Sequence, residues 1–163
     1  MKKIVIRFNA PVILAFALLS LLALLLGKWT DGAATYQYFS VYRASLSDPL
    51  TYVRFFGHVL GHADYEHYMG NMLLILLVGP GLEEKYGSGT MVWTIAVTAL
   101  VTGLVHFVFF PGSVLLGASG VVFMMIVLSS FTAMRRGEIP ITLILVVIFY
   151  LGGEIMDGLF KQD

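Results

Sequence analysis

Three of the four histidines lie close together in the sequence, and an asparagine follows them at once. His67 and Asn71 are four residues apart at the start of an apolar stretch, and residues with this spacing share one face of a helix. An imidazole N–H and an amide NH₂ that converge on one point are neutral donors, which can stabilise an oxygen atom that becomes negatively charged. His58 and His62 show the same spacing just before them. The pattern favours an oxyanion-binding site.

Two other interpretations of the histidine cluster stay open. The side chains could simply cap helix ends at a membrane interface. The spacing of His58 and His62 also suits two ligands of a metal ion. However, the sequence has no His-Glu-x-x-His motif and no well-placed third ligand, so we expect no metal and no other cofactor.

A second group of residues that could take part in a reaction is the run Gly117-Ala118-Ser119-Gly120, which opens an apolar segment after a Pro-Gly loop. Serine at this place is most often only the N-cap of a helix. The small neighbours would let other helices approach and would leave room for a substrate carbonyl at the serine oxygen. Backbone N–H groups at a helix start also attract anions. Together with His67 and Asn71, Ser119 is a candidate nucleophile.

The elements that would position these residues are membrane helices. Hydrophobic residues make up 58% of the chain and charged residues 12%, against roughly 45–50% and about 25% in soluble domains. The apolar residues form blocks of bilayer length, and only helices satisfy their own backbone hydrogen bonds there. Gly79-Pro80-Gly81 weakens the end of the second block, and the charged run Glu83-Glu84-Lys85 follows it. Five spans are predicted, at residues 10–26, 67–82, 91–110, 119–134 and 139–151.

Residues 28–57 do not read as a span, because they mix charged residues with many tyrosines. Aromatic side chains with a polar tip favour the headgroup zone, so we expect an amphipathic interfacial loop. Counted on alternate sides of the five spans, six lysines and arginines fall on the side of the N-terminus and four on the other. This bias predicts a cytoplasmic N-terminus.

Charge and cysteine content exclude several classes of function. The formal net charge is zero, so no basic field would recruit nucleic acid. The sequence has no cysteine, which excludes disulfides, thiolate metal sites and a cysteine nucleophile.

In combination, these features resemble the rhomboid family of intramembrane serine proteases. The resemblance rests on the interfacial loop, on His67-x-x-x-Asn71, on the run from Gly81 to Gly89 and on Gly117-x-Ser119-Gly120. It covers nearly the whole chain. It implies an all-α membrane protein, a rhomboid-like polytopic helical bundle with five of six transmembrane helices present. Residues 1–163 would form a single rhomboid-like membrane domain.

The resemblance also implies roles for individual residues. Ser119 would be the nucleophile of a serine endopeptidase, with His67, Asn71 and the Ser119 backbone N–H as the oxyanion hole. His62 would line the same cavity, and Glu83 would tie down the loop after the second span. The expected partners are transmembrane helices of substrate proteins in the lipid bilayer. The expected location is a bacterial plasma membrane, as a multi-pass protein.

The family uses a Ser–His dyad whose histidine lies on a sixth helix, whereas no histidine follows Ser119 in this sequence. We therefore expect the chain to be a fragment that is nearly inactive as it stands, because losing a positioned base costs about 10²–10⁴-fold in rate. The alternative is a catalytically inactive rhomboid-like protein that binds transmembrane helices.

Overall fold

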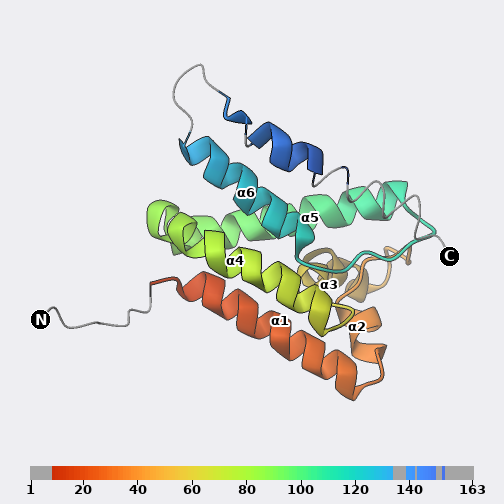
Figure 1. Ribbon diagram of the computed structural model, residues 1–163. Coiled ribbons are helices and arrows are strands. Elements are labelled where there is room, and N and C mark those ends of the chain that lie inside the picture. The colour runs from red at the N-terminus through yellow and green to blue at the C-terminus, as the bar shows by residue number, and fades with distance from the viewer. Residues whose placement is uncertain (1–8, 134–138, 142, 150–151, 153–163) are drawn as a thin grey trace, which may run out of the picture.

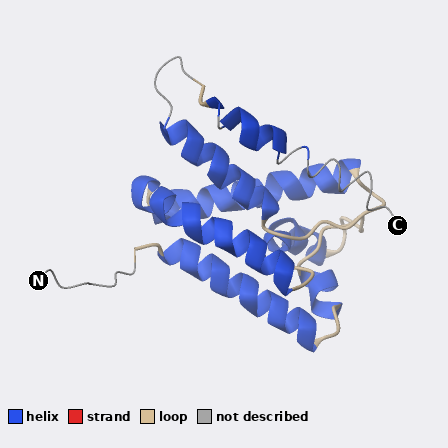
Figure 2. Cartoon of the chain, viewed as in Figure 1, coloured by secondary structure: helices blue, strands red, loops and turns tan. Residues whose placement is uncertain are grey.

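The computed structural model describes residues 9–133, 139–141, 143–149 and 152. Within these residues the chain is helical, with one isolated β-bridge between Val41 and Leu115 (Figure 1, Figure 2). The helices are α1 (Pro11–Trp29), α2 (Ala33–Tyr38), α3 (Pro49–Gly57), the short 3₁₀ helix η1 (His58–Leu60), α4 (Tyr65–Tyr86), α5 (Ser88–Phe109) and α6 (Ser119–Ala133). Residues 143–149 are helical as well.

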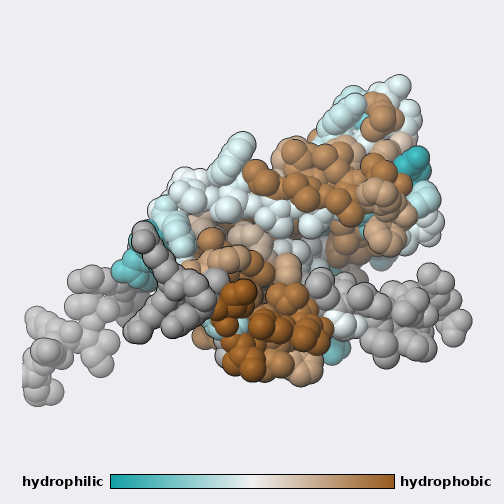
Figure 3. Space-filling model, turned by 90° about the horizontal axis from the view of Figure 1, so that it is seen from above, coloured by the Kyte–Doolittle hydropathy of each residue, from teal (hydrophilic) through white to brown (hydrophobic). Residues whose placement is uncertain are grey.

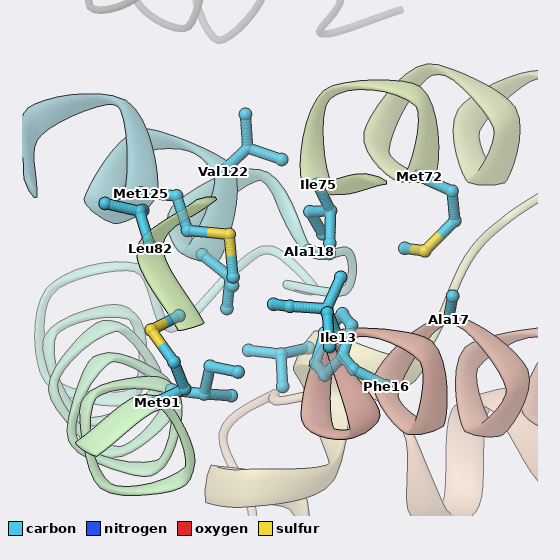
Figure 4. Packing of buried hydrophobic residues seen from close by; sticks show 14 of the residues in the cluster. Ile13, Phe16, Ala17, Met72, Ile75, Leu82, Met91, Ala118, Val122 and Met125 are labelled. Atoms are coloured by element: carbon cyan, nitrogen blue, oxygen red, sulfur yellow. The ribbon is translucent and has the colours of Figure 1, made fainter. Parts of the chain in front are cut away.

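Helix α4 occupies the middle of the bundle. It packs against α1 on one side and α6 on the other, and α5, which contacts all three, passes behind α6 (Figure 1). Figure 4 shows the core between them, where Ile13 of α1, Ile75 of α4, Met91 of α5 and the α6 residues Val122 and Met125 meet. All five side chains are buried. This packing fixes the start of α6 relative to the start of α4.

Large apolar side chains also cover the outside of the bundle. Leu18 and Leu22 of α1 and Leu77 of α4 are each more than half exposed, and Figure 3 shows extended hydrophobic areas on one face. By length and hydropathy α1 and α5 could each cross a bilayer, and α6 is a shorter apolar helix. An exposed apolar surface of this extent suits lipid better than water. The expectation of an all-α, membrane-type bundle is confirmed.

The helix bounds differ from the predicted spans in one instructive place. Helix α4 continues past residue 82, where the predicted span ends, to Tyr86, with Pro80 inside it. Proline removes one backbone donor, which membrane helices tolerate when neighbouring helices surround them. The helix ends before Gly87, whose φ is +84°. Of the other predicted spans, residues 134, 142, 150 and 151 lie outside the described residues.

The segment between α1 and α4 is more ordered than a loop, because α2 and α3 fold over one end of the bundle. The guanidinium of Arg54 is its main link: Nε donates to the Gln37 carbonyl at 2.9 Å, and Nη1 lies 3.3 Å from the Asp48 carboxylate. Arg54 also lies over the Tyr42 ring, 4.6 Å from its centroid. Since α3 packs on α5 and leads directly into η1, this segment sets the position of His58.

Candidate active site

The first turn of α4 is fixed by its own cap. Asp64 is the N-cap residue, and its carboxylate accepts the backbone N–H of His67 at 2.8 Å. Such a cap satisfies one of the free donors at a helix start and anchors the turn. As predicted from their spacing, His67 and Asn71 therefore lie one turn apart on a regular helix.

Gly117 connects this turn to the predicted nucleophile. Its backbone N–H donates to the carbonyl of His58 at 2.9 Å, and its φ is +120°. A Cβ atom built on Gly117 would lie 2.8 Å from both Cε1 and Nε2 of His67, and 3.8 Å from Nδ2 of Asn71. The imidazole and the amide thus converge on the backbone two residues before Ser119. Only glycine combines this φ with this close approach.

His62 contacts the same pair from the other side. Its Nε2 lies 3.2 Å from Nδ2 of Asn71, and its Nδ1 lies 3.1 Å from the Leu60 carbonyl oxygen. The rings of His62 and His67 meet edge to face with centroids 5.0 Å apart. Burial lowers the pKa of His62 from 6.5 to about 4, and the nearby His67 ring adds to this effect. His62 is therefore uncharged at neutral pH.

His58 points away from this group. Its Nε2 lies 3.0 Å from the Ala99 carbonyl oxygen of α5 and 3.4 Å from the Thr102 hydroxyl. Burial lowers the pKa of His58 as well. His58 and His62 therefore do not form a ligand pair, and in the part of the chain that the structure describes no three His, Asp or Glu side chains could share a metal ion.

The predicted site residues line two different hollows. One, of about 550 Å³, is lined by His67, Asn71 and Glu66 of α4 and by Val122 of α6. The other, of about 530 Å³ between α5 and α6, is lined by Ser119 and Gly117 among others. Ser119 and the His67/Asn71 pair therefore do not line the same hollow in this structure.

Glu83 has the partner that was expected and two more. Its buried carboxylate accepts the backbone N–H groups of Val12 and Ile13, each at 3.0 Å, and the Ser88 hydroxyl at 2.6 Å. It therefore holds the segment after the predicted second span, through Ser88, and also the first turn of α1. Anionic side chains are favourable at such helix starts because the free N–H groups carry partial positive charge. The role is structural, as expected, but it is distant from the site.

Sequence reasoning did not single out two residues that shape the site. Tyr68 lies edge to face with His62 at a centroid distance of 5.5 Å and donates its hydroxyl to the Ala17 carbonyl oxygen at 3.1 Å. Thr102 packs against Gly120, where a Cβ would lie 3.1 Å from its methyl carbon. Tyr68 belongs to no sequence motif that would predict a partner, so its contact with His62 is known only from the structure.

A bundle of apolar helices with a half-buried His67 and a buried Asn71 at one end defines an integral membrane protein with a polar site near its surface. The family model for the Rhomboid domain matches residues 49–163, which is well over half of the chain. The chain belongs to the rhomboid family, and so to a family of intramembrane proteases. No curated protein sequence matches the chain closely enough to add to this finding.

Proposed function

We propose that the chain is the catalytic part of an intramembrane serine endopeptidase that cleaves transmembrane helices of other membrane proteins. The observation that supports this best is the convergence of His67 and Asn71 on Gly117, two residues before Ser119. The Rhomboid match spans all of these residues. The substrates are membrane-embedded proteins, and the reaction uses no metal or cofactor.

In the proposed reaction, the Ser119 hydroxyl oxygen attacks the carbonyl carbon of the scissile peptide bond, and its proton passes to the histidine base of the dyad. The carbonyl oxygen becomes an oxyanion, which takes hydrogen bonds from the His67 ring, the Asn71 amide and the Ser119 backbone N–H. Donors aimed at the oxyanion act most strongly in the transition state, and removing one costs about 10²–10³-fold in kcat. The base then gives the proton to the amine nitrogen as the C–N bond breaks, which leaves an acyl-enzyme; water hydrolyses it, and the water's proton returns through the base to the Ser119 oxygen.

The proposed orientation places this site near the outer surface of the membrane. The end of α1 and the start of α4 lie together, since the Lys28 ammonium lies 6.0 Å from the centroid of the Tyr65 ring. Trp29, at the end of α1, is 85% exposed, as suits an interfacial residue. With a cytoplasmic N-terminus, α1 ends outside, so water would reach His67 from that side.

A second candidate function follows from the general base. A Ser–His dyad needs a histidine beside the serine as its general base. His58 and His62 are both engaged by other partners. This favours, as the alternative, a rhomboid-like protein without catalytic activity that binds transmembrane helices.

The test compares two serines on the same helix. A reporter with one transmembrane helix and a tag at each end is incorporated with the chain into liposomes, and cleavage is followed by gel electrophoresis. We expect slow cleavage, about 10²–10⁴-fold below that of an enzyme with a positioned base, by the wild type and by Ser130→Ala, whose hydroxyl donates to the Ile126 carbonyl oxygen, and none by Ser119→Ala.

Equal cleavage by Ser119→Ala would refute the proposed nucleophile. An intact reporter with every variant would refute the protease proposal for this chain. Photo-crosslinking of the uncut reporter to the chain would then support the helix-binding alternative.

A further inference from the structure

We propose that His62 is a positioning residue for Asn71. A neutral imidazole, protonated on Nδ1, accepts one N–H of the Asn71 amide and thereby fixes which end of the amide faces Gly117. The hydrogen bond itself can be tested without any catalysis. The purpose given to it rests on the proposed function, in which Asn71 stabilises the oxyanion.

The two neighbours of His62 determine its tautomer. Nδ1 lies 3.1 Å from the Leu60 carbonyl oxygen, and a carbonyl can only accept, so Nδ1 carries a proton. A neutral imidazole has a single N–H, which leaves a lone pair on Nε2. Nε2 lies 3.2 Å from Nδ2 of Asn71, and an amide nitrogen can only donate. The contacts agree with one arrangement of hydrogens.

This arrangement settles the orientation of the Asn71 amide. The amide oxygen and nitrogen have almost the same size, so packing alone does not distinguish them. The lone pair of His62 does, because it holds Nδ2 on the side where it lies 3.8 Å from the Cβ position of Gly117. The second N–H of Nδ2 is then available to an oxyanion. A reversed amide would present its oxygen there and repel the negative charge.

The His62 ring is itself held in place. Its side chain is 1% exposed, and it lies between the edges of His67 and Tyr68, at interplanar angles of 71° and 85°. The Tyr68 hydroxyl donates to the Ala17 carbonyl oxygen of α1 at 3.1 Å, so the Tyr68 ring that contacts His62 is itself held by a neighbouring helix. The ring therefore has little freedom to turn away from Asn71.

The first experiment measures the tautomer directly. The full chain, with ¹⁵N in its histidine rings, is studied by NMR in detergent micelles at pH 7. The His62 signals are assigned by their loss in His62→Gln, with His106→Gln as a control for a histidine remote from the site. We expect a protonated Nδ1 and an unprotonated Nε2. A His62 that is protonated on Nε2, or charged, would overturn the proposal whether or not the chain cleaves substrates.

The second experiment tests whether the His62–Asn71 hydrogen bond contributes to catalysis, by measuring kcat and KM for the reporter. Leucine at position 62 removes the acceptor, whereas the side-chain oxygen of glutamine can still accept from Asn71. We expect His62→Leu to lower kcat about 10- to 100-fold with KM unchanged, because a misplaced donor acts on the transition state. His62→Gln should recover part of the loss, and His106→Leu should lose nothing.

The outcomes separate the two ideas. A folded His62→Leu variant with wild-type kcat would overturn the positioning role. A wild type that cleaves nothing would count against the proposed function alone, because the NMR result still decides whether His62 orients Asn71.

Discussion

Replacing Gly117 by alanine tests the contact that joins the serine segment to the donor pair. Two costs are expected. The backbone at φ +120° suits glycine only, and a side chain there costs about 1–3 kcal/mol. The new Cβ would also lie 2.8 Å from two atoms of the His67 ring, well inside normal contact. Forcing an extra carbon into a packed site costs about 1–3 kcal/mol more.

Two other glycines separate these costs. Gly32 has a φ of +87° and nothing within 4 Å of its Cβ position, so Gly32→Ala carries backbone strain without a clash. Gly112 has neither a positive φ nor a close neighbour, so Gly112→Ala carries neither cost. The difference in unfolding free energy between Gly117→Ala and Gly32→Ala therefore measures the contact with His67.

The assay is unfolding of the purified chain by titrating SDS into mild detergent micelles, followed by circular dichroism. We expect the unfolding free energy of Gly112→Ala to match that of the wild type, that of Gly32→Ala to fall by about 1–3 kcal/mol and that of Gly117→Ala to fall by about 2–6 kcal/mol, the sum of both costs. The ring ¹⁵N signals of His67 should shift only in Gly117→Ala. If Gly117→Ala behaves like Gly32→Ala and leaves His67 undisturbed, Gly117 does not pack against the imidazole.

Two further predictions use the same unfolding assay. Glu83→Gln should lower the unfolding free energy by about 1–3 kcal/mol, because an amide NH₂ would face the N–H groups of Val12 and Ile13. The control is Glu84→Gln, since Glu84 is exposed. Equal stability of the two variants would contradict the role of the Glu83 carboxylate. The His62 pKa, about 4 when folded against 6.5 in the unfolded chain, means that the unfolded chain takes up the proton first as pH falls. The stability that the neutral His62 ring contributes is fully present above pH 6.5 and is lost as the pH falls toward 4, by up to about 3 kcal/mol. His62→Gln should reduce this dependence of the unfolding free energy on pH. The same dependence in the variant and the wild type would argue against a buried neutral imidazole.

Local spacing was enough to predict part of the site. His67 and Asn71 fall on one regular helix, so four residues of separation translate directly into a shared face. The same rule did not apply to His58 and His62. Gly61 between them is extended, with φ −72° and ψ +142°, so the two rings do not share a helix face. The sequence did not reveal this break, since nothing distinguishes Gly61 from a helical glycine in a membrane protein.

Contacts between distant segments were beyond sequence reasoning. The partners of Glu83 lie about seventy residues away at the start of α1, and the contact of Gly117 with His67 joins two helices that a loop and α5 separate. Spacing predicts which residues of one helix face the same way, but not which helix they face. The family resemblance suggested that Ser119 and His67 lie near each other; what the structure shows is the close approach of His67 to Gly117, whose φ is +120°.

The capping of α4 explains why the proposed oxyanion site relies on side chains. Free N–H groups at a helix start can bind an anion, but the Asp64 carboxylate already occupies one of them at the start of α4. A second negative charge would be repelled there. In the proposed mechanism, donors on α4 therefore come from side chains further along the helix, and Asn71 is a donor without charge. Because an uncharged amide attracts an anion only through a correctly aimed hydrogen, its orientation matters more than it would for a lysine or an arginine. Under that mechanism, catalysis depends on the bond from Asn71 to His62, which is why we test it through kcat.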